Sequence, residues 1–281
     1  MVNYNGRLLP SDEVKITPSN RAFNYGDGVF ETVKIRNGRL VFWEEHYFRL
    51  MASMRMIRMK IPVEFTLEFL ENEILKTIAP LDIQTNLRAR LSVFRKDGGL
   101  YMPTSNDVDF LVVVTPMSHV IKEEYHVDLY KDFFIHSGYL STIKSTNKLI
   151  YTLASIYAQE HALDNCILLN ERKGVVEVTN ANIFLVKDSL VKTPSLSEGC
   201  LNGIIRAKVI DMLSKNDSYT IEESIITPFE IQKADDIFIT NCLMGIQPVT
   251  KFRKKGFKTD LARKLQSHLK VMEVTSGGQL R

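Results

Sequence analysis

Cysteine is scarce in this sequence and follows no recognisable pattern. Among 281 residues there are only Cys166, Cys200 and Cys242, which are far apart and form neither a CxxC nor a Cys/His spacing. Such usage argues against a disulfide framework and a cysteine-based zinc centre, and we predict no metal site. It is also typical of a reducing compartment, so we expect a cytoplasmic protein.

Long apolar runs and blocks of one charge are missing as well. No run reaches the roughly 18 apolar residues that a membrane-spanning helix needs, and the first residues lack the apolar segment of a signal peptide. The 36 Lys and Arg residues nearly balance the 33 Asp and Glu residues, and like charges do not cluster along the chain. We therefore expect neither a membrane nor a nucleic-acid partner.

The first half of the chain combines strands and amphipathic helices. Asn5-Gly6 and Asn37-Gly38 are hairpin signals between apolar runs. Apolar residues at three- and four-residue steps predict helices over 44–59 and 65–78. Strands are expected at 1–4, 7–9, 29–35, 40–42, 87–94 and 108–115.

The second half mixes the two element types without a regular βαβ rhythm, which favours an α+β fold over a doubly wound sheet. Expected strands are 127–129, 133–136, 165–169, 174–178, 183–186, 190–192 and 236–240, and expected helices are 148–161, 203–215, 228–233 and 259–271. A connection at 116–124 would divide the chain into a small domain, residues 1–118, and a larger domain, residues 119–281.

Lys144 is a candidate nucleophile. It lies between the apolar Ile143 and a polar Ser-Thr-Asn run, just before a predicted helix. A partly desolvated lysine has a lowered pKa suited to Schiff-base chemistry. Taken alone, however, the position favours an ordinary surface lysine in a loop.

Glu177 interrupts an otherwise apolar strand, Val175-Val176-Glu177-Val178. If both faces of that strand are covered, the carboxylate needs a partner, because an unpaired buried charge is too costly. If the strand lies at an edge, the side chain can face water. The sequence leaves both alternatives open.

Two further positions could hold a phosphate. The segment Gly203–Arg206 opens a helix, and free backbone N–H groups at a helix start bind anions. Arg49, within helix 44–59, could supply a bidentate clamp. Most helix starts bind only water, and most helical arginines are solvated, so neither position indicates a function by itself.

The order and spacing of these features carry more information than any one of them. The relevant segments are Phe23–Glu31, His46–Leu50, Lys144–Asn147, Glu177, Asn182–Phe184, Thr193–Pro194, Leu201–Arg206, Asn241–Met244 and Pro248–Val249. Together they resemble the class IV aminotransferases, the fold-type IV pyridoxal-phosphate enzymes. The resemblance implies a small α/β N-terminal domain, a larger β-rich domain, pyridoxal 5'-phosphate as cofactor and a homodimer.

The resemblance also implies a role for each candidate. Lys144 would form the Schiff base and move the substrate proton, and Glu177 would face the pyridine nitrogen and keep it protonated. Arg49 and the N–H groups of Ile204 and Ile205 would hold the phosphate. The remaining cofactor contacts would come from Leu201, Cys242 and Leu243.

The substrate implied is a small anion that carries an amino group. Arg88 and Arg90 lie on one strand face by their spacing, and either of them, or Arg95, could bind a substrate carboxylate; the alternative is an exposed strand face. Phe30 and Tyr101 complete the expected substrate contacts. By resemblance, the loop 95–101 would border the active site of a partner subunit.

The sequence departs from the aminotransferase pattern at two places. Ile205 and the pair Cys242-Leu243 stand where aminotransferases of this family usually carry hydroxyl residues. This pattern, and the Gly98-Gly99-Leu100-Tyr101 loop, resemble the aminodeoxychorismate lyases of the family. We therefore expect a lyase that converts aminodeoxychorismate to p-aminobenzoate and pyruvate, a step of folate biosynthesis.

Two alternatives remain open. One is an amino-acid transaminase of the branched-chain type with 2-oxoglutarate as acceptor, since Glu31 is common in transaminases. The other is a relative that binds pyridoxal phosphate or another small ligand without turnover, because a shared fold does not fix function.

Overall fold

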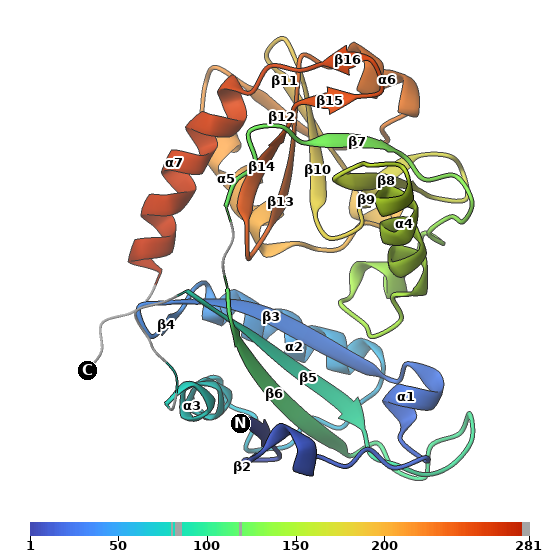
Figure 1. Ribbon diagram of the computed structural model, residues 1–281, viewed down its shortest axis with the longest axis vertical. Coiled ribbons are helices and arrows are strands. Elements are labelled where there is room, and N and C mark those ends of the chain that lie inside the picture. Colours follow the sequence, from blue (N-terminus) through green and yellow to red (C-terminus); the bar gives the residue numbers. More distant parts are fainter. Residues whose placement is uncertain (80, 82–85, 118–119, 277–281) are drawn as a thin grey trace. The chain divides into compact units, whose positions relative to one another are not determined.

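The computed structural model describes residues 1–79, 81, 86–117 and 120–276, which form two compact units (Figure 1). Unit 1 contains the described residues of 1–118, together with 144–147 and those from 273 onward. Unit 2 contains 120–143 and 148–272. The division expected at residue 118 thus omits two segments that belong to unit 1, and the expected connection at 116–124 lies partly outside the described residues.

Unit 1 is built on a six-stranded antiparallel sheet with the strand order β2-β1-β6-β5-β3-β4. Its strands are β1 (Val2–Tyr4), β2 (Arg7–Leu9), β3 (Gly28–Arg36), β4 (Arg39–Leu40), β5 (Leu87–Arg95) and β6 (Val108–Pro116). Side chains alternate between the faces of a strand. Glu31 and its cross-strand partner Leu91 therefore point to one face, and Phe30 and Arg90 point to the other.

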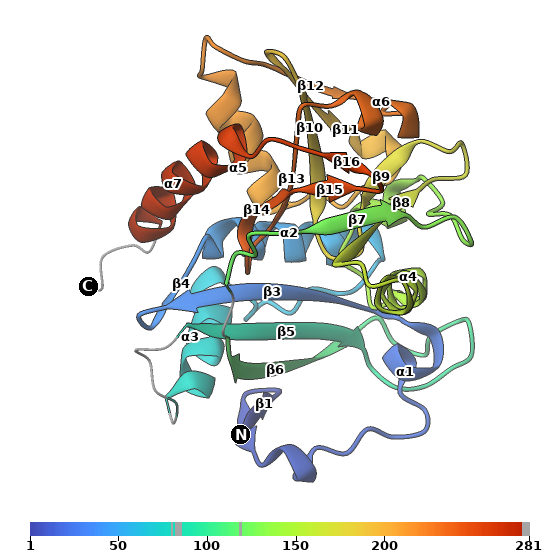
Figure 2. The same ribbon diagram turned by 45° about the horizontal axis from the view of Figure 1, so that its top comes forward.

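Helices α2 (Trp43–Met56) and α3 (Leu67–Ile78) cover the Glu31 face of this sheet, behind the strands in Figure 2. His46 of α2 contacts Glu31, and Phe69 of α3 packs edge-on against Phe110 of β6, with 6.2 Å between ring centroids. Thr66 caps α3 by accepting a hydrogen bond from the N–H of Phe69. The short helices of this unit are η1 (Ser11–Glu13) and α1 (Arg21–Tyr25).

An ion-pair network fixes the loop that follows β5. Oδ2 of Asp27 accepts hydrogen bonds from Nε of Arg21 (2.8 Å) and from Nε of Arg95 (2.9 Å). The buried Arg21 also donates to the carbonyl oxygens of Gly98 and Leu100. The loop is thereby tied to α1 and to the start of β3 by an arginine that the sequence analysis did not single out.

Unit 2 contains two five-stranded sheets, with the orders β12-β11-β10-β13-β14 and β16-β15-β7-β8-β9. Its strands are β7 (His126–Leu129), β8 (Asn165–Leu169), β9 (Val175–Val178), β10 (Asn182–Lys187), β11 (Leu190–Pro194), β12 (Thr220–Ser224), β13 (Asp236–Asn241), β14 (Gly245–Val249), β15 (Lys251–Phe252) and β16 (Lys255–Gly256). Both sheets contribute to one apolar core that includes Val127, Ile183 and Ile239. Both also mix parallel and antiparallel pairs, which confirms the expected α+β fold.

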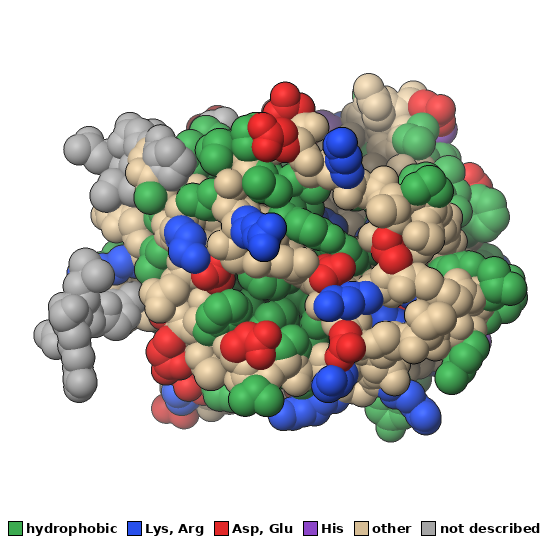
Figure 3. All heavy atoms as spheres, turned by 90° about the horizontal axis from the view of Figure 1, so that it is seen from below, with side chains coloured by type: hydrophobic (Ala, Val, Ile, Leu, Met, Phe, Trp, Pro, Cys, Tyr) green, Lys and Arg blue, Asp and Glu red, His purple; other side chains and the backbone are tan. Residues whose placement is uncertain are grey.

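The helices of unit 2 cover its sheets and connect their strands. Ala154 and Ala158, one turn apart on α4, pack against Cys166 and Leu168 of β8. The helices are η2 (Tyr139–Thr142), α4 (Leu149–Glu160), η3 (Leu196–Glu198), α5 (Ile204–Ser214), α6 (Pro228–Lys233) and α7 (Asp260–Thr275), whose last residues belong to unit 1. Within the described ranges, no helix is long and apolar enough to cross a membrane. The face in Figure 3 shows Lys and Arg side chains interspersed with Asp and Glu, as the near-balanced composition suggests.

One expected strand is wrong, and α1, β12, β14, β15 and β16 were not expected from the sequence. Residues 133–136 do not form a strand, since Ile135 makes only an isolated bridge to Asn170. Strand β12 was missed because it is an exposed edge strand whose glutamates hide its alternation. Strand β14 was missed because it contains Pro248, which is tolerated at the edge of a sheet.

Asp236, the first residue of β13, is a buried carboxyl group. Its Oδ2 accepts a hydrogen bond from the N–H of Leu261 in the first turn of α7 (3.2 Å), whereas Oδ1 has no hydrogen-bond partner among the described residues. Burial raises the pKa of this carboxyl to about 6, although the N–H groups of Ala262 and Leu261 act in the opposite direction.

We therefore predict that Asp236→Asn changes the pH dependence of stability. The wild type binds this proton more tightly when folded than when unfolded, so it loses stability as the pH rises from about 4 to about 6. Asparagine does not titrate, so the variant does not lose this stability. The difference in unfolding free energy, variant minus wild type, should therefore rise by about 2 kcal/mol over this pH range. Denaturant titrations from about pH 4 to about pH 8 measure it, and a constant difference would contradict the prediction.

Candidate active site

Backbone hydrogen bonds place Lys144 against the start of β3 in unit 1. The N–H of Phe30 donates to the carbonyl of Lys144 (2.9 Å), and the N–H of Thr146 donates to the carbonyl of Gly28 (2.9 Å). Gly26 is required beside this segment, because its φ is +63° and a Cβ there would collide with the side-chain amide of Asn147. Lys144 is therefore half-buried and held in one place, unlike a lysine in a mobile surface loop.

Phe30 forms a platform beside the Lys144 ammonium. The Nζ atom of Lys144 lies 4.8 Å from the centroid of the Phe30 ring, and Cζ of Arg90 lies 3.6 Å from the same centroid. Nε of Arg90 donates to Oγ of Ser92 (3.2 Å), which holds the guanidinium in this position. Three of the residues expected from sequence are thus brought together within unit 1.

Arg88 lies next to Arg90 on the same face of β5. Burial, followed by the charge of Arg88, lowers the pKa of Arg90. In the described part of the chain neither arginine forms an ion pair with a carboxylate. Two neighbouring cations without a carboxylate partner repel each other, and an anion that binds to both relieves this repulsion.

Arg49 lies on the other face of β3, where it meets Glu31. Its Nε and Nη2 atoms donate to the two carboxylate oxygens of Glu31 (2.7 and 2.6 Å), and His46 contacts the same carboxylate at 2.7 Å. Burial would raise the pKa of Glu31, but Arg49 and His46 outweigh it and hold that pKa far below its ordinary value. Glu31 thus orients Arg49, whose contact with a phosphate remains a prediction.

Arg95 has a structural role that the sequence did not indicate. Besides Asp27, its guanidinium donates to the carbonyl oxygens of Ile57 (2.7 Å) and Arg58 (3.3 Å) and to the side chain of Asn106. Because these contacts use the N–H donors of Arg95 within unit 1, Arg88 and Arg90 are the better candidates for binding a substrate carboxylate. Tyr101 is almost fully exposed, with its ring 5.8 Å from that of Tyr25.

Glu177 is buried in unit 2 and is held by several hydrogen bonds. Tyr151 Oη donates to Oε1 (2.7 Å), while the N–H of Leu201 (3.0 Å) and Nδ2 of Asn182 (3.3 Å) donate to Oε2. Burial and the nearby Glu177 charge raise the pKa of Tyr151, which therefore remains a donor. Strand β9 lies at the edge of its sheet, as one of the two alternatives supposed, but it is buried along its length and its carboxylate is partnered, as the other alternative required.

Lys148 was not identified from the sequence, although it lies only four residues after Lys144. Its Nζ atom lies 4.2 Å from the centroid of the Tyr151 ring. Burial lowers the pKa of Lys148, and the charge of Glu177 acts in the opposite direction. The one sequence signal that could have identified Lys148 is its position just before a helix. Lys144 has the same signal, so only the packing around each side chain distinguishes the two lysines.

The start of α5 offers backbone N–H groups and no hydroxyl group. Gly203 precedes the helix without capping it by a side chain, and Ile204 and Ile205 are both buried. Arg206 anchors the turn by donating to the carbonyl of Pro194 (2.8 Å) and to Glu223 (2.5 Å). A helix start of this kind fits a phosphate group.

The second expected phosphate position, Cys242-Leu243, is a turn between β13 and β14. The N–H groups of Leu243 and Met244 both donate to Oδ1 of Asn241 (2.9 Å each). The N–H of Leu243 is therefore engaged within the turn, and any contact of Cys242 or Leu243 with the cofactor remains a prediction.

These groups fit pyridoxal phosphate. A buried carboxylate suits a protonated pyridine nitrogen, and the helix start suits the phosphate; both features belong to unit 2. No group of three or more His, Cys, Asp or Glu residues suited to a metal was found among the described residues. Lys144, in unit 1, carries an amine of the kind that pyridoxal phosphate requires, and its attachment to the cofactor remains a prediction.

Comparisons with known proteins agree with this chemistry. Residues 28–252 match the family model for amino-transferase class IV. Aminodeoxychorismate lyase of Vibrio harveyi is 28% identical over 273 residues, which cover 93% of this chain and 97% of that protein. D-alanine aminotransferase of Listeria innocua is 28% identical over 271 residues, which cover 89% and 86%.

The fold is likewise shared with solved structures. The crystal structure of a branched-chain aminotransferase from Thermoproteus uzoniensis superimposes with a TM-score of 0.88 at 24% identity, covering 98% of this chain and 95% of that one. Class IV aminotransferases use pyridoxal 5'-phosphate. The chain belongs to the class IV aminotransferases and is a pyridoxal-phosphate-dependent enzyme of that family.

Proposed function

We propose that the enzyme is an aminodeoxychorismate lyase, which converts aminodeoxychorismate to p-aminobenzoate and pyruvate. The observation that carries this proposal is the start of α5, where the buried Ile205 offers no hydroxyl group to a phosphate. Cys242 likewise has no hydroxyl group at the second expected phosphate position. The similarity to the Vibrio harveyi lyase, along nearly the whole of both chains, supports the same activity.

The Phe30 face of unit 1 supports a substrate with two carboxylates. Arg88 and Arg90 lie side by side there, and Phe30 offers an aromatic surface. Aminodeoxychorismate carries two carboxylates and an unsaturated ring, so its charges would bind the arginines. Its ring would lie against Phe30.

The proposed chemistry assigns a proton transfer to Lys144. Bound pyridoxal phosphate supplies an electron sink for negative charge that develops beside the substrate amino group. Lys144 would remove the proton from the ring carbon that bears this amino group and would then return a proton to the departing three-carbon group. Glu177 would keep the pyridine nitrogen protonated, and aromatisation of the ring favours the elimination.

A transaminase is the second candidate, and one observation favours it. The pair Arg88 and Arg90 would also bind the two carboxylates of 2-oxoglutarate, the usual acceptor of amino groups. Lys144 would then move the proton from the substrate α-carbon to the cofactor carbon that receives the amino group.

A two-substrate assay distinguishes these functions. We expect pyruvate release from aminodeoxychorismate, and no glutamate from a branched-chain amino acid with 2-oxoglutarate. Arg90→Ala should lower kcat/KM for aminodeoxychorismate about tenfold to a hundredfold, because a charged hydrogen bond is lost. The matched control is Arg7→Ala, an exposed arginine of β2.

Glutamate formation without pyruvate release would select the transaminase instead. Inactivity in both reactions would indicate a relative that binds its ligand without turnover. An unchanged kcat/KM in Arg90→Ala would remove the proposed carboxylate contact.

A pair of lysine variants tests the attachment of the cofactor. Lys144→Ala should lose the visible absorbance of the lysine-bound cofactor, because no other amine is pinned beside Phe30 in the described part of unit 1. Lys148→Ala, four residues away, should retain it. Borohydride reduction and peptide mass analysis identify the modified lysine, and modification of Lys148 in the wild type would overturn the assignment.

We also propose that the enzyme is a homodimer. Phe23, Leu100, Tyr101 and Met102 are each more than three-quarters exposed, although all four are large and apolar. Arg21 holds this loop in place through the carbonyl oxygens of Gly98 and Leu100. A fixed, exposed apolar loop is typical of a surface that a second subunit covers.

Sedimentation of loop variants tests the dimer. Leu100→Asp with Met102→Asp should convert the dimer to a monomer, because charged groups would have to be buried in the interface. Val63→Asp, at an equally exposed valine of unit 1, should leave the mass unchanged. A monomeric wild type, or a dimeric loop variant, would contradict the proposal.

We further propose a cytoplasmic location. Cys166 and Cys200 are buried free thiols, and burial raises the pKa of each to about 12. Unpaired thiols of this kind are typical of proteins in a reducing compartment.

A further inference from the structure

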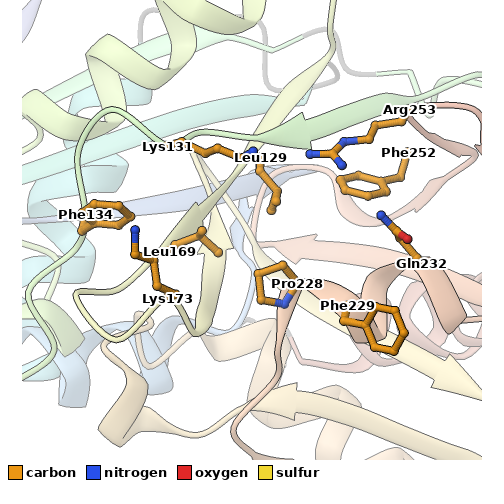
Figure 4. Close-up of a pocket in the computed structure, with 10 residues that line it drawn as sticks. All are labelled: Leu129, Lys131, Phe134, Leu169, Lys173, Pro228, Phe229, Gln232, Phe252 and Arg253. Carbon is orange, nitrogen blue, oxygen red and sulfur yellow. The ribbon is translucent and has the colours of Figure 1, made fainter.

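Unit 2 contains a pocket of about 470 Å³ that none of the proposed chemistry uses (Figure 4). It lies where β7, β8 and β15 meet α6. Its size falls within the range of about 300–1,000 Å³ that is usual for small-molecule sites. The residues of its floor and of its rim determine which kind of ligand it would bind.

The floor of the pocket is apolar. Leu129, Leu169 and Phe252 are buried there and belong to the core that the two sheets share. Pro228 and the exposed Phe229 of α6 form one side, and Phe134 forms another. A flat apolar group would remove these surfaces from water.

The rim of the pocket is positively charged. Lys131, Lys173 and Arg253 contribute to it, and none of the ten described residues that line the pocket is acidic. Figure 4 shows the side chains of Lys131 and Arg253 pointing toward each other from opposite sides. Asp128 accepts one hydrogen bond from Nε of Arg253 (2.9 Å), whereas neither Lys131 nor Lys173 forms an ion pair among the described residues, so two cations of the rim are not neutralised by a carboxylate partner.

Lys173 is presented by a rigid and strained turn. Its φ is +67°, a left-handed conformation in which a glycine or asparagine would be less strained. The buried Asn170 fixes the turn, because its Oδ1 accepts hydrogen bonds from the N–H groups of Arg172 and Gly174. The Lys173 ammonium lies 4.5 Å from the centroid of the Phe134 ring, so a cation and an aromatic surface occur together at the rim.

The pocket is separate from the cofactor residues of unit 2. Glu177 pairs with Leu168 across β8 and β9, and its carboxylate meets Tyr151 of α4. Leu168 belongs to the apolar cluster beneath α4, whereas Leu169 belongs to the core between the two sheets. The pocket floor and Glu177 therefore lie on opposite faces of the same sheet.

We infer that this pocket is a second binding site, which takes a small anion with a flat apolar body, such as an aromatic carboxylate. The carboxylate binds between Lys131, Lys173 and Arg253, and the ring lies over Leu129, Leu169 and Phe252. The inference does not depend on which reaction the enzyme catalyses.

Calorimetric titration with 2-naphthoate tests the site, with 2-naphthalenemethanol as the neutral counterpart. The protein is the enzyme with its cofactor bound, in an Arg88→Ala, Arg90→Ala background that removes the candidate carboxylate site of unit 1. We expect naphthoate to bind this protein, and the alcohol to bind about tenfold or more weakly, because it lacks the charge. Raising the ionic strength from about 0.02 M to about 0.5 M should weaken naphthoate binding.

Charge reversal locates the binding. Lys131→Glu with Lys173→Glu should weaken naphthoate binding about tenfold or more, because two attractive charges become repulsive. The matched control, Lys251→Glu with Lys264→Glu, reverses two exposed lysines of unit 2 outside the pocket and should change the affinity less than about twofold.

Three results would overturn the inference. The first is that naphthoate does not bind in the Arg88→Ala, Arg90→Ala background. The second is equal affinity for naphthoate and the alcohol, and the third is an equal effect of the two charge reversals on naphthoate affinity. Thermal midpoints of all variants establish that they are folded, and the salt dependence tests the charged rim without any pocket substitution.

Discussion

Two backbone hydrogen bonds, from Phe30 N–H to Lys144 and from Thr146 N–H to Gly28, hold residues 144–147 against the start of β3. The position of Lys144 depends on them, because they fix its backbone beside the Phe30 ring. Arg90 meets the same ring, so the Lys144 amine and the Arg90 guanidinium share one aromatic surface. The chain then continues directly into α4, which carries the Tyr151 hydroxyl that donates to Glu177.

Carboxylates held by several donors occur in both units, but their partners differ in kind. The buried Glu31 and the half-buried Asp27 are paired with arginines, which stabilise the anions and in turn orient Arg49, Arg21 and Arg95. Glu177 instead accepts hydrogen bonds from a hydroxyl, an amide and a backbone N–H, and its charge also acts on the nearby Lys148. These donors hold the buried carboxylate in place, and its contact with a protonated pyridine nitrogen remains a prediction.

The arginines of β5 show what a local sequence pattern can and cannot predict. Strand alternation correctly placed Arg88 and Arg90 on one face, since it depends only on the two-residue period of a strand. It did not predict that the guanidinium of Arg95, on the same strand, is engaged in hydrogen bonds to Asp27, Ile57, Arg58 and Asn106. Those partners are 11 to 68 residues away in sequence, and no local signal records them.

The sequence by itself determined most of the element types, the α+β class and the order of the motifs, because these depend on periodicity, turn residues and residue identity. It also contained the family resemblance that the comparisons bear out. Only the tertiary structure decided that Glu177 is covered and partnered, that Arg21 holds the loop after β5, and that residues 144–147 belong with unit 1. The reason is physical: burial, ion pairing and desolvation arise from contacts between segments far apart in the chain, and they exist only after folding has brought those segments together.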